Sequence, residues 1–340
     1  MFTLLTGLHG RGHSMHLVCQ PRSLLEKRAR DAGISVYQMA IRSEAGLLSL
    51  FRLMVVLRKV RPQILAFNTP RAVIAGNLAS RFSAVQARII FRRVSFPLRN
   101  NPLTRMKYRL GIDCIVAISE SIRSQLLARG IPPGLIRIIY EGMDLAHYPK
   151  RNGPAYRPGT PVVIGTIAHL SSEKGINHLI EAASLIPDAA SRMRFVVVGD
   201  GSLRRELEQQ VRAANLENCF QFAGFQENTR DYLTSFDIFV LPSLSEGLSS
   251  SILSAMASSL PVVATRVGGI PELVHQGDNG LLVPPADPPA LAQALQCLAE
   301  NPAERLRMGQ RGRARMESEF TLERKIEETE RLCYSLVQQP

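Results

Sequence analysis

Short runs of β-branched and apolar residues alternate along this chain with longer segments whose apolar positions recur at helical spacing. Segments such as 22–32 and 120–129 have the helical pattern and stand between the short runs. Strands that alternate with helices are typical of a parallel sheet covered on both faces. The pattern therefore predicts an α/β protein. The predicted strands are 14–19, 34–39, 63–67, 87–92, 113–118, 135–140, 162–168, 194–199, 219–224, 237–242, 261–267 and 280–283.

The strands fall into two series, separated by the Pro-, Gly- and charge-rich segment 148–161, which predicts an interdomain linker. We expect two doubly wound, Rossmann-like domains, residues 1–150 and 151–320, since 340 residues suit two domains of roughly 150. Residues 321–340 predict a terminal helix that returns to the first domain. One apolar stripe on this helix needs a surface to pack on: Leu322, Ile326, Thr329, Cys333 and Leu336.

The first domain opens unusually. A doubly wound domain normally begins with a strand, a glycine-containing turn and a helix, whereas residues 1–19, "MFTLLTGLHGRGHSMHLVC", have the pattern of a helix followed by a strand. We therefore expect the first strand to be absent from this sequence. No secretory signal is evident. The most apolar run, 47–57, is too short to span a bilayer and contains Arg52, so it predicts a core-packed helix.

Charge is distributed unequally between the two predicted domains. Residues 1–150 carry 23 Lys and Arg against 7 Asp and Glu, a net charge of +16, and residues 151–340 carry 18 against 22, a net charge of −4. A basic half suits an anionic partner: nucleic acid, an anionic membrane surface or an acidic lipid-linked substrate. A solvated basic surface without a partner remains open. Five scattered cysteines without a Cys-x-x-Cys pair indicate reduced, buried thiols in the cytoplasm.

Candidate chemistry lies in the strand-to-helix loops of the second domain, because open α/β sheets bind ligands beyond the carboxyl ends of their strands. A lysine, glycine amides and helix N-termini at one edge favour an anion such as a diphosphate. Each feature alone is also ordinary turn chemistry, and a lone carboxylate before a helix is often just stabilised by the helix dipole. The four loops are 165–175 with His169 and Lys174, 197–202 with Gly199 and Gly201, 246–263 headed by Glu246, and 263–274 with Gly268 and Gly269.

These loops resemble those of the GT-B nucleotide-sugar glycosyltransferases of retaining family 4. The resemblance runs from about residue 2 to 337 and rests on "SSEKG", "VVGDGS", "FVLPSLSEGLSSSILSAM", "PVVATRVGGIPELV" and "GDNGLLVPPADPPALAQAL" in this order. It implies transfer of a sugar from a nucleotide-sugar donor, with retention at the anomeric carbon, to a cell-envelope glycan or lipid-linked acceptor. For the basic half we expect docking on the inner face of the cytoplasmic membrane, so the protein is expected to be cytoplasmic and peripheral. No cofactor is expected, the nucleotide-sugar being a substrate. No Asp-x-Asp and no zinc-ligand spacing occurs, so no metal is expected either.

The resemblance also assigns residues. Lys174 matches the lysine that pairs with the donor diphosphate, and Glu246 matches the first of two glutamates, which contacts the donor sugar; these two are the expected catalytic residues. The wider donor site would comprise Lys174, His169, Gly199, Gly201, Gly247, Leu248, Ser249, Ser250, Ser251, Ser254, Gly268 and Gly269.

Three features depart from the family pattern. Ser254 stands where the second glutamate usually holds the ribose; a hydroxyl makes no charge-assisted contact, which would weaken nucleotide binding by roughly 1–2 kcal/mol. Alternatively, Ser254 is a small residue packed under the loop. His169 replaces an arginine. The third departure is the missing first strand, which would remove the glycine turn that faces the donor. The first-domain histidine of the family is not evident either, and near its place Arg92 and Arg93 could bind an anionic acceptor or be solvated strand-end charges.

Two other classes remain open. A degenerate member of the family would bind an envelope intermediate or a partner enzyme without transferring sugar. A nucleic-acid-binding protein would use the basic half. The absence of a recognition-helix or RRM pattern, 6% aromatic residues and no Trp argue against nucleic acid. The expected partners are therefore the donor and the acceptor, with an anionic membrane surface as a further candidate.

Overall fold

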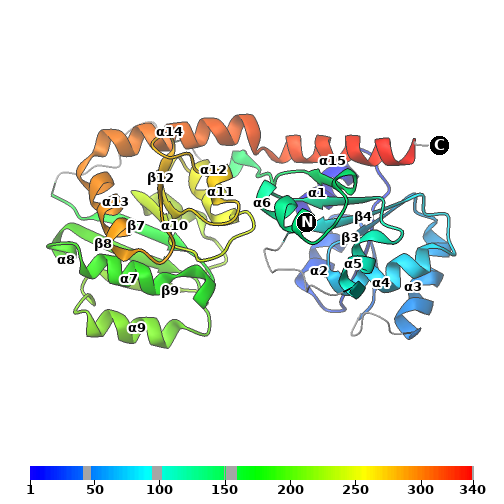
Figure 1. Cartoon of the computed structure of the whole chain (residues 1–340), viewed down its shortest axis with the longest axis horizontal. Coiled ribbons are helices and arrows are strands. Elements are labelled where there is room, and N and C mark those ends of the chain that lie inside the picture. The colour runs from blue at the N-terminus through cyan, green and yellow to red at the C-terminus, as the bar shows by residue number, and fades with distance from the viewer. Residues whose placement is uncertain (41–46, 94–101, 149, 151–158, 339–340) are drawn as a thin grey trace. The chain divides into compact units, whose positions relative to one another are not determined.

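The computed structural model describes residues 1–40, 47–93, 102–148, 150 and 159–338 (Figure 1). The chain divides into two compact units, and each is described by itself. Unit 1 comprises Met1–Gly142 and Leu322–Pro340, and unit 2 comprises Met143–Thr321. The linker predicted over 148–161 lies largely outside the described residues. All the predicted strands are present and every strand pairing is parallel, which confirms the α/β class.

Unit 2 contains a six-stranded parallel sheet in the order β12-β11-β10-β7-β8-β9. The chain builds the sheet outward from β7 in one direction and from β10 in the other, so the strand order reverses between these two neighbours. Ligand crevices of doubly wound sheets open at such a reversal, beyond the carboxyl ends of the strands. The strands are β7 (Val162–Ile167), β8 (Met193–Val198), β9 (Phe220–Gly224), β10 (Ile238–Leu241), β11 (Val262–Thr265) and β12 (Gly280–Val283).

Helices cover this sheet. Apolar residues of α7, α9 and α13 pack with those of the central strands in one buried cluster, in which Phe195 and Phe220 stack with ring centroids 4.5 Å apart. Gly165 on β7 leaves room for Phe236, since a Cβ there would lie 2.1 Å from the ring. The helices are α7 (Ile176–Ser184), α8 (Ala189–Arg192), α9 (Arg204–Ala213), α10 (Arg230–Ser235), α11 (Ser250–Ala257), α12 (Ile270–Leu273), α13 (Pro288–Glu300) and α14 (Pro302–Glu319), with 3-10 turns η2 (Leu145–His147) and η3 (Ser172–Lys174).

Unit 1 differs from the single sheet that the sequence predicts. Its described strands form a two-stranded sheet, β1 (His16–Cys19) with β2 (Ser35–Gln38), and a four-stranded sheet in the order β3-β4-β5-β6. No strand pairing among the described residues joins these two sheets. The second sheet contains β3 (Ile64–Phe67), β4 (Ala87–Arg92), β5 (Cys114–Ala117) and β6 (Ile136–Ile138).

The opening and closing helices of the chain pack together in unit 1. As predicted, residues 2–10 form a helix, and the apolar stripe of α15 is covered: Ile326 is buried with Leu4 and Leu8 of α1 over strands β4 and β5. Gly7 permits this approach, since a Cβ there would lie 2.2 Å from Cδ1 of Ile326. The helices of unit 1 are α1 (Phe2–Gly10), α2 (Leu24–Asp31), α3 (Leu47–Val60), α4 (Pro70–Ser80), α5 (Pro102–Arg109), α6 (Glu120–Ala128) and α15 (Leu322–Val337), with the 3-10 turn η1 (Pro133–Leu135).

Two predictions about burial are wrong in part. Helix α3 is core-packed only on the side that carries Leu53 and Leu57; its other side exposes Leu48 and Phe51, at 64% each. The apolar residues of 47–57 are spread around the helix, so some of them face the core and others face solvent. Among the cysteines, Cys297 on α13 is exposed rather than buried. Among the described residues, no helix is long and apolar enough to cross a bilayer.

Candidate functional site

The strand-to-helix loops of unit 2 are joined to one another by backbone hydrogen bonds at the carboxyl edge of the sheet. The amide of Leu170 donates to the carbonyl of Asp200 at 3.0 Å, and the amide of Leu203 donates to the carbonyl of Leu170 at 3.2 Å. The amide of Leu244 donates to the carbonyl of Glu173 at 2.7 Å. Three loops that are distant in the sequence therefore form one backbone surface.

Two of the predicted site glycines exist because backbone passes too close for a side chain. Gly268 has φ +53°, and a Cβ there would lie 1.8 Å from the carbonyl oxygen of Glu246. Gly199 has φ +132°, and its Cβ would lie 1.9 Å from the carbonyl oxygen of Ala168. These positions require glycine for both dihedral and steric reasons. The β11–α12 loop is thereby brought against the residue that the sequence singled out, Glu246.

Lys174 and Glu246 meet directly. Nζ of Lys174 lies 2.5 Å from Oε1 of Glu246, and Oγ of Ser243 donates to the same oxygen at 3.1 Å. Glu246 is only 8% exposed, whereas the Lys174 side chain is partly open to solvent. The lysine ends the turn η3, and Gly175 follows in the left-handed conformation. The result is a cation at the protein surface, held from beneath by a buried carboxylate.

The alternative that Glu246 is only a carboxylate at a helix N-terminus is wrong. Helix α11 begins at Ser250, and its N-cap is Ser249, whose Oγ accepts the amide hydrogen of Ile252 at 3.3 Å. Glu246 precedes this cap by three residues, and its carboxylate is bound by side chains instead. Gly247 and Leu248, between the two, are buried. Ser251 Oγ lies 3.1 Å from Ser249 Oγ, which makes a hydroxyl pair at the start of the helix.

Ser254 lies one turn into α11 and is partly open to solvent, so it is not a residue packed under the loop. Its hydroxyl donates to the carbonyl of Ser250 at 3.0 Å and lies 3.4 Å from the hydroxyl of Tyr148. The guanidinium of Arg230 stands over the ring of the same tyrosine, 5.6 Å from its centroid. A tyrosine hydroxyl and an arginine thus stand near the position at which the family has a carboxylate.

Sequence reasoning missed Tyr148 and Arg230. Arg230 opens α10, the helix after β9, and a fifth strand-to-helix connection at the same sheet edge was a signal that could have included it. Tyr148 carried no such signal. It stands at the start of the predicted linker, and only the fold brings it back beside α11.

The other predicted donor-site residues are less closely tied to the Lys174–Glu246 pair. The His169 side chain is exposed and makes no hydrogen bond to any part of the chain that the structure describes. Gly201 brings the β8–α9 loop against Leu170, whose carbonyl oxygen would lie 2.3 Å from a Cβ. Gly269 precedes α12, which is a single turn of four residues. The expected contribution of a helix dipole at Gly268 and Gly269 is therefore small, since the dipole needs aligned peptides.

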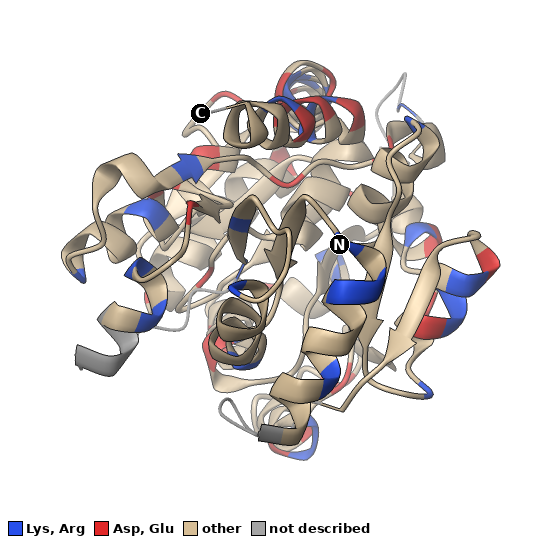
Figure 2. Ribbon diagram, turned by 90° about the vertical axis from the view of Figure 1, so that its right-hand side faces the viewer, with Lys and Arg blue, Asp and Glu red and all other residues tan. Residues whose placement is uncertain are grey.

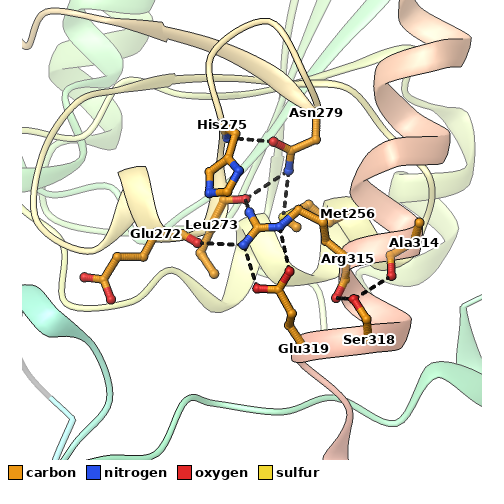
Figure 3. A network of polar contacts seen from close by, with 9 residues as sticks. All are labelled: Met256, Glu272, Leu273, His275, Asn279, Ala314, Arg315, Ser318 and Glu319. Carbon is orange, nitrogen blue, oxygen red and sulfur yellow. Dashed lines mark hydrogen bonds and ion pairs between the residues drawn. The ribbon is translucent and has the colours of Figure 1, made fainter.

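A polar network fixes the segment that follows these glycines (Figure 3). Arg315 on α14 donates to the carbonyls of Leu273 at 2.7 Å and Glu272 at 3.2 Å, and Glu319 binds the same guanidinium. Asn279 donates to the Leu273 carbonyl at 2.9 Å and accepts the amide hydrogen of His275. The carbonyls at the end of α12 thus accept hydrogen bonds from Arg315 and Asn279, and these bonds hold the β11–β12 connection in place.

In unit 1, Arg92 ends strand β4 and Arg93 follows it. Arg92 is 6% exposed, so the alternative of a solvated strand-end charge is wrong for it. Nε of Arg93 is buried and has no hydrogen-bond partner among the described residues, and its guanidinium lies 5.7 Å from the Phe91 ring centroid. Most of the segment 91–102, from residue 94 to 101, lies outside the described residues.

A buried ion pair lies near these arginines. Lys325 on α15, 4% exposed, pairs with Glu141, which follows β6. Burial would raise the pKa of the Glu141 carboxyl, but the charges of Lys325 and Arg93 outweigh burial and lower this pKa. Burial lowers the pKa of Lys325. The Lys325–Glu141 pair thus ties the terminal helix to the segment that follows β6, and the charge of Arg93 acts on the same carboxylate.

Comparison with known proteins identifies the family. The model described as "Glycosyltransferase Family 4" matches residues 1–147, and that described as "Glycosyl transferases group 1" matches residues 161–301. Together they account for most of the chain, in the order that the resemblance requires. The chain belongs to the family 4 glycosyltransferases. The GT-B fold agrees: a structure of Alr3699/HepE from Anabaena, solved in complex with UDP, superposes with a TM-score of 0.84 at 20% identity, covering 98% of this chain and 94% of that one.

Curated relatives in the family share more sequence. The amylovoran biosynthesis glycosyltransferase AmsK of Erwinia amylovora is 31% identical over 216 residues, which are 61% of this chain and 53% of the relative. The lipopolysaccharide core biosynthesis glycosyltransferase LpsE of Rhizobium meliloti is 28% identical over 275 residues, 78% of this chain and 74% of the relative. The chain thus spans about half the length of the first of these relatives.

Proposed function

We propose that this family 4 glycosyltransferase moves a sugar from a nucleotide-sugar donor, with retention at the anomeric carbon, to a cell-envelope glycan or lipid-linked acceptor, without a metal ion. The observation that carries the proposal is the Lys174–Glu246 pair, at 2.5 Å, on the backbone surface made by the loops of unit 2. The names of the relatives, which concern amylovoran and lipopolysaccharide core biosynthesis, support an envelope polysaccharide as the product.

The residues of the site suit the demands of such a transfer. The bond from the anomeric carbon to the diphosphate oxygen breaks as the acceptor hydroxyl oxygen bonds to the same carbon on the same face of the sugar. The acceptor proton passes to the leaving diphosphate. The leaving diphosphate gains charge, so cations and amides aimed at it stabilise the transition state. Lys174, partly open to solvent, would bind the diphosphate together with amides near Gly268 and the start of α11. Glu246 would hold Lys174 in position and accept a hydrogen bond from a hydroxyl of the donor sugar.

Metal independence rests on the same cation. Lys174 would neutralise the diphosphate in place of a divalent ion. Among the described residues no group of His, Cys, Asp and Glu side chains is arranged to hold a metal. We expect that EDTA leaves the activity unchanged and that Mg²⁺ or Mn²⁺ does not raise it. Activity that EDTA abolishes and Mg²⁺ restores would refute this part of the proposal.

The first test is thermal unfolding of the purified chain with UDP, GDP, ADP and CMP. One nucleotide is expected to stabilise the protein by about 2–3 kcal/mol at a hundredfold excess over its dissociation constant. The variant Lys174→Ala should lose this shift, whereas Lys150→Ala, which removes an exposed lysine paired with Glu317, should keep it. If no nucleotide shifts the transition, the degenerate, non-catalytic alternative replaces the proposal.

Retention has its own readout. With the donor that the nucleotide panel indicates and a simple alkyl glycoside as acceptor, the anomeric coupling constant of the product reports the configuration. Donor and product should share the same anomeric configuration, and an inverted product would refute retention while leaving transfer itself intact.

A further inference from the structure

The sequence of unit 1 contains a long stretch without a single carboxylate. Residues 45–112 include no Asp or Glu and 13 Lys and Arg. This stretch supplies helices α3, α4 and α5, so the excess of positive charge is concentrated on part of the unit rather than spread over it. Figure 2 colours the Lys and Arg positions of the ribbon blue.

Within this stretch, one face of α3 exposes large apolar side chains. Leu48 and Phe51 are each 64% exposed and Val55 is 51% exposed. At 100° per residue, these three positions lie within about 60° of one another on the helix. The opposite side of α3 is buried, because Leu53 and Leu57 pack in a buried cluster with Ala79 of α4. The exposed face is therefore a distinct surface and not a poorly packed core.

Cations border this apolar strip. On the helical projection Arg52 lies on one side of it and Arg58 on the other, about 40° and 80° from Leu48, and Lys59 continues it one turn beyond Val55. All three are exposed, and none forms an ion pair with any described residue. The neighbouring helix α4 adds exposed Leu78 and, just past its end, Phe82, together with exposed Arg71 and Arg81. We call Leu48, Phe51, Arg52, Val55, Arg58 and Lys59 the α3 face.

We propose that the α3 face docks this protein on the surface of an anionic lipid bilayer, with its apolar strip in the acyl boundary and its cations at the headgroups. The proposal rests on the proposed function, in which a lipid-linked acceptor would lie in a membrane, and it assigns residues to the peripheral location expected from the sequence. An interfacial helix is recognised by large apolar side chains on one face and Lys or Arg along the border, without the length to span. Helix α3 has 14 residues and meets each condition.

The charge pattern favours a bilayer over other occupants. Two copies of this chain meeting at their α3 faces would bring like charges together. Nucleic acid would pair with the cations but would leave the apolar strip in water or against phosphates. An anionic bilayer accommodates both components, since phospholipid headgroups attract the cations and the acyl boundary receives the apolar side chains.

The test is co-sedimentation with vesicles of phosphatidylcholine alone and of phosphatidylcholine with phosphatidylglycerol. Binding is expected only to the vesicles with phosphatidylglycerol, and it should weaken at high salt. Leu48→Ser/Phe51→Ser should reduce the partition coefficient by roughly tenfold or more. Arg58→Gln/Lys59→Gln should reduce it by about tenfold and flatten the salt dependence.

Matched controls exist in unit 2. Leu185→Ser/Phe225→Ser removes two exposed apolar side chains, and Arg205→Gln/Arg212→Gln removes two exposed cations. Both should bind vesicles like the parent chain. Equal losses in the controls would show a general effect of hydrophobicity or net charge and would overturn the proposal. So would absence of binding to the phosphatidylglycerol vesicles.

A fluorescence readout places the contact directly, because the chain contains no Trp. In Phe51→Trp the emission should shift to shorter wavelength on addition of phosphatidylglycerol vesicles and should be quenched by brominated acyl chains; in Phe225→Trp it should do neither. If light scattering shows a dimer that the Leu48→Ser/Phe51→Ser variant no longer forms, and the parent chain does not bind vesicles, the α3 face is assigned to a second copy of the chain. Binding to duplex DNA in place of vesicles would assign it to nucleic acid.

The outcome is separable from that of the proposed function. Vesicle binding is measured without a nucleotide, and the nucleotide panel is measured without vesicles. The α3 variants should keep the nucleotide-dependent thermal shift of the parent chain, which also shows that they fold. If no nucleotide shifts the thermal unfolding of the parent chain but vesicle binding is observed, the proposed sugar transfer is refuted and the proposed docking surface is retained.

Discussion

Unit 1 and unit 2 are both parallel α/β units, yet their charged residues are used differently. In unit 2 the key cation, Lys174, is balanced by the buried carboxylate of Glu246, and close backbone approaches at Gly199 and Gly268 fix the loops around it. In unit 1 cations outnumber carboxylates. Arg92 and Lys325 are buried, whereas the cations of the α3 face are exposed without an ion pair among the described residues. The comparison teaches that the site proposed for a small anion rests on a fixed backbone, whereas the surface proposed for an extended anion rests on charge and apolar area.

The largest effect should come from the fixed backbone. Gly268→Ala would place a Cβ 1.8 Å from the Glu246 carbonyl at φ +53°, so the loop must move. We expect a loss of about 3 kcal/mol in the stability of unit 2, together with loss of nucleotide binding. Urea titration with hydrogen–deuterium exchange of unit 2 peptides measures it. The control is Gly277→Ala, which has a similar φ of +75° but open space and should cost about 1 kcal/mol. Equal costs would show that strain in φ, and not the close approach, makes Gly268 necessary.

The buried charge of unit 1 should have the next largest effect. Lys325→Met leaves the carboxylate of Glu141 without its ion-pair partner and should destabilise unit 1 by about 2 kcal/mol. Arg324→Met, one residue earlier on the same helix, removes an exposed pair with Glu328 and should cost less than about 0.5 kcal/mol. Exchange of α15 peptides distinguishes the two. If Lys325→Met proves neutral, the terminal helix is held by its apolar stripe alone.

Restoring a carboxylate should sharpen the site of unit 2. Ser254→Glu should strengthen binding of the nucleotide by about 1–2 kcal/mol, roughly tenfold, because a carboxylate accepts both ribose hydroxyls. Ser254→Gln, which is similar in size but uncharged, should gain less. Calorimetric titration provides both values. Weaker binding in Ser254→Glu would show that the Tyr148 hydroxyl and Arg230 already form the ribose contact, which a longer side chain disturbs.

The smallest expected effect is a dependence on acid pH. The pKa of Glu141 is lowered in the folded state, so its contribution to stability is complete above the ordinary glutamate pKa of about 4.3 and is lost as pH falls through the lower folded value. Acid unfolding of unit 1, followed by exchange, should therefore be shallower in Glu141→Gln than in the parent chain. Identical profiles would show that Glu141 gains nothing from Lys325 and Arg93.

Sequence alone determined the strands and the family, because hydrophobic periodicity and the order of short motifs are local properties. It also determined the stripe of α15, since Leu322, Ile326 and Cys333 share one face at helical spacing whatever they pack on. The Lys174 and Glu246 assignments came from the same motifs, and the structure brings these two side chains together.

Only the tertiary structure decided the rest. It placed Tyr148 beside Ser254, a contact between residues 106 positions apart that no local pattern encodes. It buried Arg92, and it showed that Gly268 is required by a carbonyl 22 positions earlier in the chain. It also divided the apolar run of α3 into a packed side and an exposed one. The physical reason is the same in each case: which neighbour fills the space around a side chain depends on how distant segments pack, and a periodic pattern specifies a face but not what that face meets.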